Sequence, residues 1–149
     1  MARLLFSAHT GGEVALVAAT AKTVLQVLAP ANQMVAVRSV AMSFDGVAGN
    51  AEPVVIEVTR QTTAGTMSSG TKTKMRPGSA AIQATVTRDA SAPPTAGDSI
   101  FYENIHPQTG VEFRWAPDED VVLDGGERLG LRITAPANVN VIARFLCEE

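Results

Sequence analysis

The chain has 149 residues, a hydrophobic content of 46%, a charged content of 18% and a formal net charge of −3 at pH 7. This length suits one domain with a single core, and the hydrophobic content excludes an intrinsically disordered protein. With 12 basic side chains against 15 acidic ones, the chain has no strong positive field for nucleic acid, and no apolar window is long enough to span a membrane. We therefore expect a folded protein whose partners are neither nucleic acid nor a membrane.

The amino terminus begins with a positive charge and a short apolar run, formed by Arg3, Leu4, Leu5 and Phe6. It imitates the start of a secretion signal, but polar and small residues from Ser7 onward interrupt it, which favours synthesis in the cytoplasm. Residues 1–12 are then either an apolar arm that docks onto a neighbouring protein or a first strand or strap packed on the chain's own core. The second interpretation is favoured. Residues 13–149 form the expected domain.

Short apolar runs separated by glycine and proline, with many valine and threonine residues, are typical of an antiparallel β protein. Apolar and polar side chains alternate along five runs, which predicts strands with one buried face over 54–61, 82–87, 111–115, 128–133 and 139–146. Two further runs, 23–28 and 99–105, are apolar on both faces and are expected to be covered on both. A neighbouring subunit is one candidate for the second cover.

The apolar pattern changes phase between Met34 and Asp45. The first apolar side chains of this segment are odd-numbered and the later ones even-numbered: Val35 and Val37, then Val40, Met42 and Phe44. An extra residue near Arg38 and Ser39 explains the change as a β-bulge, which we expect where a strand leaves one sheet for the other.

Turn residues separate the expected strands. The clearest hairpin is predicted at Asp124-Gly125, where it joins residues 121–123 to 128–133. Residues 62–80 are small and polar, which predicts a mobile loop or a weakly patterned strand. These breaks divide the chain into about eight strands or more.

So many short strands in one domain fit a sandwich, a jelly roll or a closed barrel. We predict an all-β, single-domain jelly-roll β-sandwich of about eight antiparallel strands. Longer crossings between two sheets suit the proline-containing connections better than two-residue hairpins do. An immunoglobulin sandwich is disfavoured because its Cys, Trp and Cys signature is absent.

Four acidic side chains are candidates for a calcium site: Asp118, Glu119, Asp120 and Asp124. Their spacing does not match an EF-hand loop, so a solvated turn is favoured, although the sequence leaves a structural ion there open. His9 and His106 stand alone, without a nucleophile or a carboxylate nearby in the sequence. We therefore expect no catalytic residue, no metal site and no cofactor, and hence no enzyme.

The other reactive or charged groups have ordinary interpretations. Cys147 has no disulfide partner, and the negative charges of Glu148 and Glu149 are expected to raise its pKa and keep the thiol inert. Three cations lie within the polar segment, where a solvated loop is favoured over contact with an acidic surface: Lys72, Lys74 and Arg76.

Several expected strands place apolar side chains on the face opposite their core. Such side chains are expected to be buried between subunits, with charged residues of the same faces pairing across the contact. The expected interface residues are Val55, Phe101, Arg114, Arg132, Ile142, Arg144 and Leu146. A closed ring is the usual arrangement, and a homotrimer is expected for a compact jelly roll. Chance exposure of single apolar residues explains the pattern equally well.

Six stretches, in this order, resemble small structural proteins of tailed bacteriophages: TAKTVLQVLAP (20–30), VAMSFDG (40–46), EPVVIEVTRQTTAGT (52–66), APPTAGD (92–98), IHPQTG (105–110) and GGERLGLRITAPANVNV (125–141). The resemblance is to head decoration, or cement, proteins with a tumour-necrosis-factor-like jelly roll. It implies a virion protein that forms homotrimers on the capsid surface and binds the major capsid protein at junctions between its subunits. It implies no catalytic residues. The segment from Arg3 to Phe6 is expected to share in docking to the shell.

Two other classes of function stay open. A carbohydrate- or receptor-binding jelly-roll module of a phage fibre or tail would use aromatic platforms. Trp115 and Tyr102 are candidates, but an aromatic content of 5% argues against this alternative. An enzyme would need a pocket in which Asp118 or Asp120 meets His106.

Overall fold

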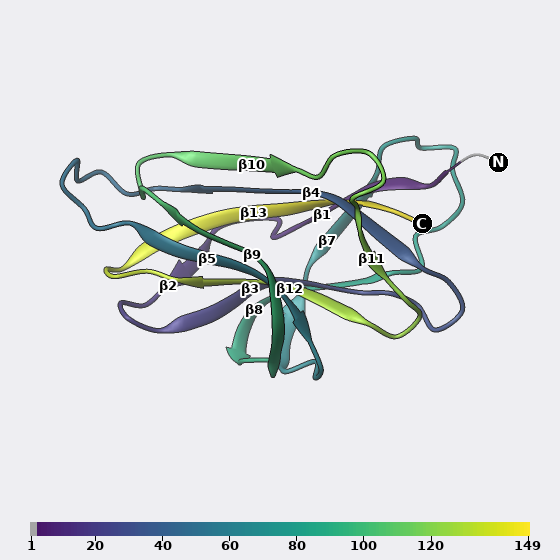
Figure 1. Ribbon diagram of the computed structural model, residues 1–149, viewed down its shortest axis with the longest axis horizontal. Helices are drawn as coiled ribbons and strands as arrows, with labels where there is room; N and C mark the ends of the chain where they lie inside the picture. The colour runs from purple at the N-terminus through teal and green to yellow at the C-terminus, as the bar shows by residue number, and fades with distance from the viewer. Residues whose placement is uncertain (1–2) are drawn as a thin grey trace.

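The computed structural model describes residues 3–149, which form two antiparallel β-sheets packed face to face as a β-sandwich (Figure 1). The strands are β1 (Leu5–His9), β2 (Val14–Leu16), β3 (Ala21–Leu28), β4 (Val35–Phe44), β5 (Val54–Gln61), β6 (Thr66–Ser69), β7 (Thr71–Lys74), β8 (Thr85–Ala92), β9 (Ala96–Ile105), β10 (Gly110–Arg114), β11 (Val121–Leu123), β12 (Arg128–Thr134) and β13 (Val139–Glu148). Residues 3–149 hold no helix, and hence none long and apolar enough to cross a bilayer.

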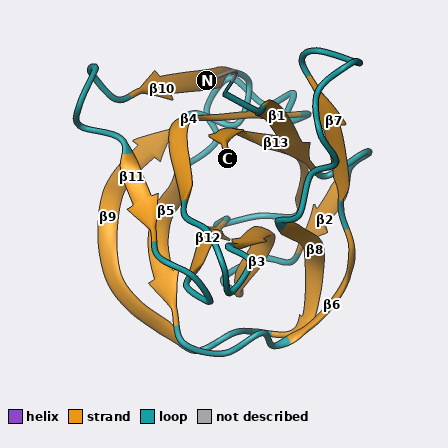
Figure 2. Cartoon of the chain, turned by 90° about the vertical axis from the view of Figure 1, so that its right-hand side faces the viewer, coloured by secondary structure: helices purple, strands orange, loops and turns teal. Residues whose placement is uncertain are grey.

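The two sheets differ in size and both are antiparallel throughout. The seven-stranded sheet has the order β10-β4-β13-β1-β7, with β11 also paired to β4 and β2 to β13. The six-stranded sheet has the order β6-β8-β3-β12-β5-β9. Its members β5 and β9 pair along almost their whole length, and the paired chains continue into β6 and β8. Residues 62–65 join β5 to β6, and residues 93–95 join β8 to β9. These two links run along the bottom of Figure 2, where the Thr62 N–H donates to Thr95 O (3.0 Å).

The core lies between the sheets and follows the predicted alternation. Three consecutive inward side chains on each of β5, β12 and β13 are buried: Val54, Ile56 and Val58; Leu129, Leu131 and Ile133; Val141, Ala143 and Phe145. Full burial of one such aliphatic or aromatic side chain contributes about 1.5–3 kcal/mol. The predicted strands at 54–61, 128–133 and 139–146 are therefore confirmed, each with the face that the sequence assigned to the core.

The predicted β-bulge is at Arg38, but β4 does not change sheets there. Leu146 pairs with Ser39 and Cys147 pairs with Val37, which leaves Arg38 as the extra residue of β4. The strand remains beside β13 on both sides of the bulge. What changes is its other neighbour, which is β11 before the bulge and β10 after it. The bulge thus divides one long strand between two short edge partners.

The change of sheet occurs instead at Gly70, within the weakly patterned segment 62–80. β6 pairs with β8 in the six-stranded sheet, and β7 pairs with β1 in the seven-stranded sheet. The Gly70 N–H donates to Val86 O (2.9 Å), and a Cβ on Gly70 would lie 2.7 Å from Val86 Cγ1. Glycine is therefore needed for this close approach. Of the two expectations for this segment, the weakly patterned strand describes residues 66–69 and 71–74.

The predicted hairpin at Asp124-Gly125 is wrong, although the turn itself is present. The Glu127 N–H donates to Asp124 O (2.9 Å), and Gly126 has a φ of +87°. However, β11 belongs to the seven-stranded sheet and β12 to the six-stranded sheet. The turn also bonds to the connection after β3, since the Ala29 N–H donates to Glu127 O (3.0 Å). Turn chemistry identified the bend but not the strands that it joins.

Cover on both faces is found for β3, the first of the two runs expected to have it. Residues 23–27 are buried, and on their outer side Gln26 Nε2 donates to Gln61 Oε1 (2.6 Å) and to Thr63 O (3.3 Å). The second cover is thus formed by the same chain, by the end of β5 and the 62–65 link that follows it. The other run, in β9, is largely exposed on both faces, and β9 is also an edge strand that pairs with β5 alone.

Candidate functional site

The amino-terminal segment is part of the larger sheet. β1 lies between β13 and β7, with Phe6 opposite Cys147 on one side and Lys74 on the other. Leu4 is 8% exposed and Phe6 is 0% exposed, so neither side chain is available to bind a shell. This corrects the expected docking role of these two residues and confirms the first strand packed on the core. Residues 1–2 of the expected arm lie outside the described residues.

Four of the residues expected to contact the shell or another subunit line one groove on the outer face of the seven-stranded sheet: Arg3, Leu5, Arg114 and Leu146. The groove has a volume of about 690 Å³ and lies at the end of the sandwich where both termini emerge (Figure 1). We call it the basic groove. Its other lining residues are Arg38, Met75, Arg76, Trp115, Pro117, Asp120 and Glu148. Leu5, Leu146 and Trp115 give it an apolar surface.

The basic groove carries an excess of positive charge. Its four arginines face two lining acids, Asp120 and Glu148, and Arg114 also pairs with Glu112 beside the groove (Nη2 to Oε1, 2.8 Å). Glu148 is bound by Arg3 (Nε to Oε1, 3.0 Å) and by Arg38, and Arg38 also lies 3.8 Å from Asp120. Arg38 lines the groove, and its Nε is buried without a hydrogen-bond partner among the described residues. Arg3, Arg38 and Arg114 thus each have a carboxylate partner, whereas Arg76 has no ion pair among residues 3–149, so its charge is left for an external anion.

The remaining expected interface residues do not form one patch. Ile142 and Arg144 lie on the outer face of the seven-stranded sheet, where Arg144 Nη2 is 3.2 Å from Glu112 Oε1. The side chains of Val55 and Arg132 lie on the outer face of the six-stranded sheet, and Arg132 bonds to Glu57 (3.1 Å). Glu57 and Glu112 thus each pair with an arginine of the same chain.

Phe101 belongs to a third surface, which we call the aromatic edge: Ile100, Phe101, Tyr102, Phe113 and Trp115. It lies where the edge strands β9 and β10 run along the same side of the sandwich (Figure 2). The ring centroids of Phe101 and Phe113 are 4.6 Å apart, and Phe113 meets Trp115 edge-on at 5.3 Å. Ile100 is 39% exposed, Phe113 37% and Tyr102 62%. Phe101 lies opposite the core residue Val58 and Tyr102 opposite Glu57, so the aromatic edge exposes apolar side chains on both faces of β9.

The candidate catalytic and metal-binding residues are kept apart. Within residues 3–149 there is no group of three His, Cys, Asp or Glu side chains that could hold a metal ion. Of the acidic turn, Asp120 is near Arg38, whereas Asp118, Glu119 and Asp124 are exposed. His9 Nδ1 accepts a hydrogen bond from the Gly11 N–H (3.1 Å), and His106 Nδ1 accepts one from the Gln108 N–H (3.2 Å). Each histidine therefore stabilises a local turn.

Cys147 is fully buried in the core beside β1 and β4. Burial raises the pKa of its thiol, and the nearby charge of Glu149 raises it further. The predicted direction is confirmed, but loss of solvation, rather than the neighbouring glutamates, is the larger cause.

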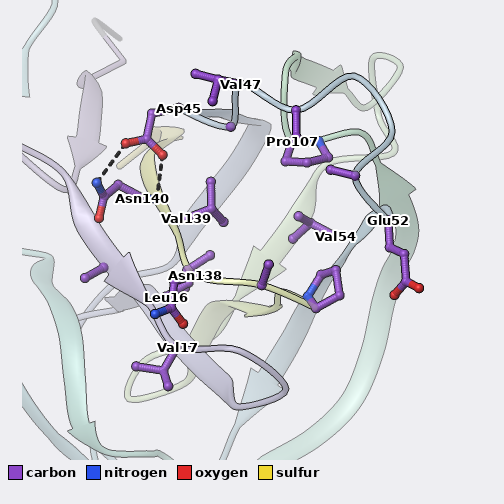
Figure 3. A pocket seen from close by; sticks show the side chains of 16 residues that line it. Leu16, Val17, Asp45, Val47, Glu52, Val54, Pro107, Asn138, Val139 and Asn140 are labelled. Atoms are coloured by element: carbon purple, nitrogen blue, oxygen red, sulfur yellow. Dashed lines mark hydrogen bonds between the residues drawn. The ribbon is translucent and has the colours of Figure 1, made fainter.

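Sequence reasoning missed a second hollow, of about 790 Å³, at the opposite end of the sandwich (Figure 3). Its walls come from the end of β2 and from the β4–β5, β9–β10 and β12–β13 connections. We call it the distal hollow. Its side chains include Leu16, Val17, Asp45, Val47, Glu52, Val54, Pro107, Asn138, Val139 and Asn140. The turn residues Pro107, Pro136 and Asn138 mark its loops in the sequence, but no local pattern indicates that these loops meet.

The chain was also compared with known proteins. No family model, no curated protein and no solved structure matches it.

Proposed function

We propose that this chain is a structural virion protein of a tailed bacteriophage, a head decoration protein that forms homotrimers on the outer capsid surface. It binds the major capsid protein at junctions between subunits and stabilises the shell. The six stretches between residues 20 and 141 that resemble phage decoration proteins support this role. The geometry contributes two surfaces suited to it, which meet at Trp115: the aromatic edge for contact between copies and the basic groove for contact with the shell.

We further propose that the sandwich is a jelly roll. Eight strands in chain order, β1, β3, β4, β5, β9, β10, β12 and β13, support this assignment. The first pairs with the last, the second with the seventh, the third with the sixth and the fourth with the fifth. Such nested pairing is expected when one long antiparallel ribbon is rolled into two sheets.

The aromatic edge supports the trimer. β9 presents ten residues of unpaired strand edge, and long exposed edges in native proteins are usually protected or covered by a partner. Exposed Ile100, Tyr102 and Phe113 are of the residue types that interface cores favour. A cyclic trimer would bury this edge against a different surface of the next copy.

The convergence of Arg3, Leu5, Arg114 and Leu146 in one groove is the observation that carries the shell-binding proposal. Residues far apart in the sequence combine positive charge with an apolar floor, which suits an acidic, partly apolar rim on a capsid subunit. A trimer would present three such grooves at once, and linked contacts strengthen weak individual ones.

The test is co-sedimentation of the purified protein with heads of the encoding phage that lack it. We expect saturable binding that weakens at least about tenfold in the double variant Arg3→Gln, Arg114→Gln and falls with added salt. The matched control is Arg88→Gln on β8, in the other sheet, which should bind like the wild type. No sedimentation with heads would refute the proposed role. Binding to a glycan array instead would support the alternative, a carbohydrate-binding module of a fibre or tail.

A further inference from the structure

The distal hollow is held in shape by contacts between its connections. Asn140 donates from its backbone N–H to Asp45 Oδ1 (2.7 Å) and from Nδ2 to Asp45 Oδ2 (2.8 Å; Figure 3). The Gly46 N–H donates to Pro107 O (2.9 Å), and a Cβ on Gly46 would lie 2.6 Å from that oxygen. The β4–β5 and β9–β10 connections are therefore in direct contact. A ligand entering the hollow would find walls that are already ordered, which reduces the entropic cost of binding.

The surface of the hollow is mainly apolar. Leu16 and Val54 are buried beneath it, and Val139 is half-buried. Val17 is 59% exposed and Val47 is 90% exposed, and the two valines lie on opposite sides of the hollow in Figure 3. A hollow flanked by two exposed valines is suited to an apolar side chain that inserts between them.

The charge of the hollow has one sign. Asp45 and Glu52 are acidic, and none of the lining residues in the described part of the chain is a lysine or an arginine. The backbone N–H of Asn140, followed by its side chain, lowers the pKa of Asp45 by hydrogen bonding to the carboxylate. Asp45 is therefore negatively charged at neutral pH.

We propose that the distal hollow binds a segment of another protein in which a lysine or arginine lies beside an apolar side chain. The apolar side chain enters between Val17 and Val47, and the cation is attracted by the negative charges of Asp45 and Glu52, which lie on opposite sides of the hollow (Figure 3). An acidic segment would meet only negative charge here. The site is distinct from the basic groove, which lies at the other end of β13 and selects the opposite charge. It requires neither the trimer nor the capsid.

The test is an NMR titration of the isotope-labelled protein at low salt with three blocked pentapeptides: Gly-Leu-Arg-Leu-Gly, Gly-Leu-Glu-Leu-Gly and Gly-Ser-Arg-Ser-Gly. We expect the first to bind with a Kd on the order of 1 mM and to shift the amide signals of Gly46, Val47 and Asn140. The acidic peptide and the serine peptide should each bind about tenfold more weakly or worse.

Two variants locate the site without disturbing the core. Glu52→Gln and Val47→Ser change exposed side chains. Each should raise the Kd of the peptide Gly-Leu-Arg-Leu-Gly about three- to tenfold. The matched controls are Glu119→Gln and Met34→Ser, which alter an exposed acid and an exposed apolar side chain outside the hollow and should bind like the wild type. Equal binding of the acidic peptide, wild-type binding by both hollow variants, or shifts confined to other residues would overturn the proposal.

Discussion

A buried thiol couples the stability of this fold to alkaline pH. The folded-state pKa of Cys147 is raised above the ordinary value of 9.0, so the folded protein keeps a proton that the unfolded chain releases. The un-ionised thiol therefore makes its full contribution to the free energy of unfolding below about pH 9. This contribution falls by about 1.4 kcal/mol per pH unit as the pH rises from there toward the folded-state pKa.

The measurement is urea denaturation between pH 8 and 10.5. The wild type should lose about 1–2 kcal/mol more than Cys147→Ala over this range, because the variant lacks the titrating group. Alanine leaves a small cavity and lowers stability at every pH, so the slope with pH is the quantity compared. Parallel slopes for the two proteins would contradict the burial of an un-ionised thiol.

A second residue-scale feature is a buried polar chain on the outer face of the six-stranded sheet. Gln61 accepts from Gln26 (2.6 Å) and donates to Thr23 Oγ1 (2.9 Å), and a Cβ on Gly130 would collide with the Gln61 side chain. Because these groups are buried, Gly130→Ala should break bonds that water does not replace, at a cost of about 1–3 kcal/mol. Gly78→Ala is the control, since a Cβ there meets no atom within 4 Å. Chemical denaturation that finds both variants equally stable would refute this packing.

At the scale of elements, the exposure of β9 leads to a prediction about assembly. Ile100→Glu places a charge on the aromatic edge, and it should weaken the proposed trimer at least about tenfold while leaving the fold of the chain intact, because Ile100 is partly exposed. Met34→Glu is the control, with a more exposed side chain (60%) that lies outside the edge. Sedimentation velocity compares the two. If the Ile100→Glu protein assembles like the wild type, the aromatic edge is not part of the interface.

Strands that bury one face were predictable from the sequence, and their neighbours were not. The residues of β5, β12 and β13 follow the period of two because each has one side against the core. The bulge at Arg38 was predictable for the same reason, since an extra residue shifts that period. Which sheet a strand joins depends on contacts distant in the sequence, so the pairing after Asp124-Gly125 was assigned incorrectly. A run that is apolar on both faces, as in β9, does not reveal whether its cover belongs to the same chain.

At the scale of the whole molecule, the sites are formed where connections and strand ends meet. The sequence supplied Arg3, Leu5, Arg114 and Leu146 as separate candidates, and folding brings them into the basic groove. The distal hollow was not predictable, because its walls come from four segments whose turn residues carry no information about one another. The two ends of the sandwich differ in charge, since arginines line the basic groove and only acids among the charged residues line the distal hollow.

The proposed decoration role depends most on self-association, because a trimer would present three basic grooves at once to a symmetric shell. The direct measurement is the mass of the purified wild-type protein by sedimentation equilibrium from about 1 µM to 1 mM. We expect about 47 kDa throughout, three times the 15.6 kDa of one chain. A mass of 15.6 kDa that persists at the highest concentration would contradict the account.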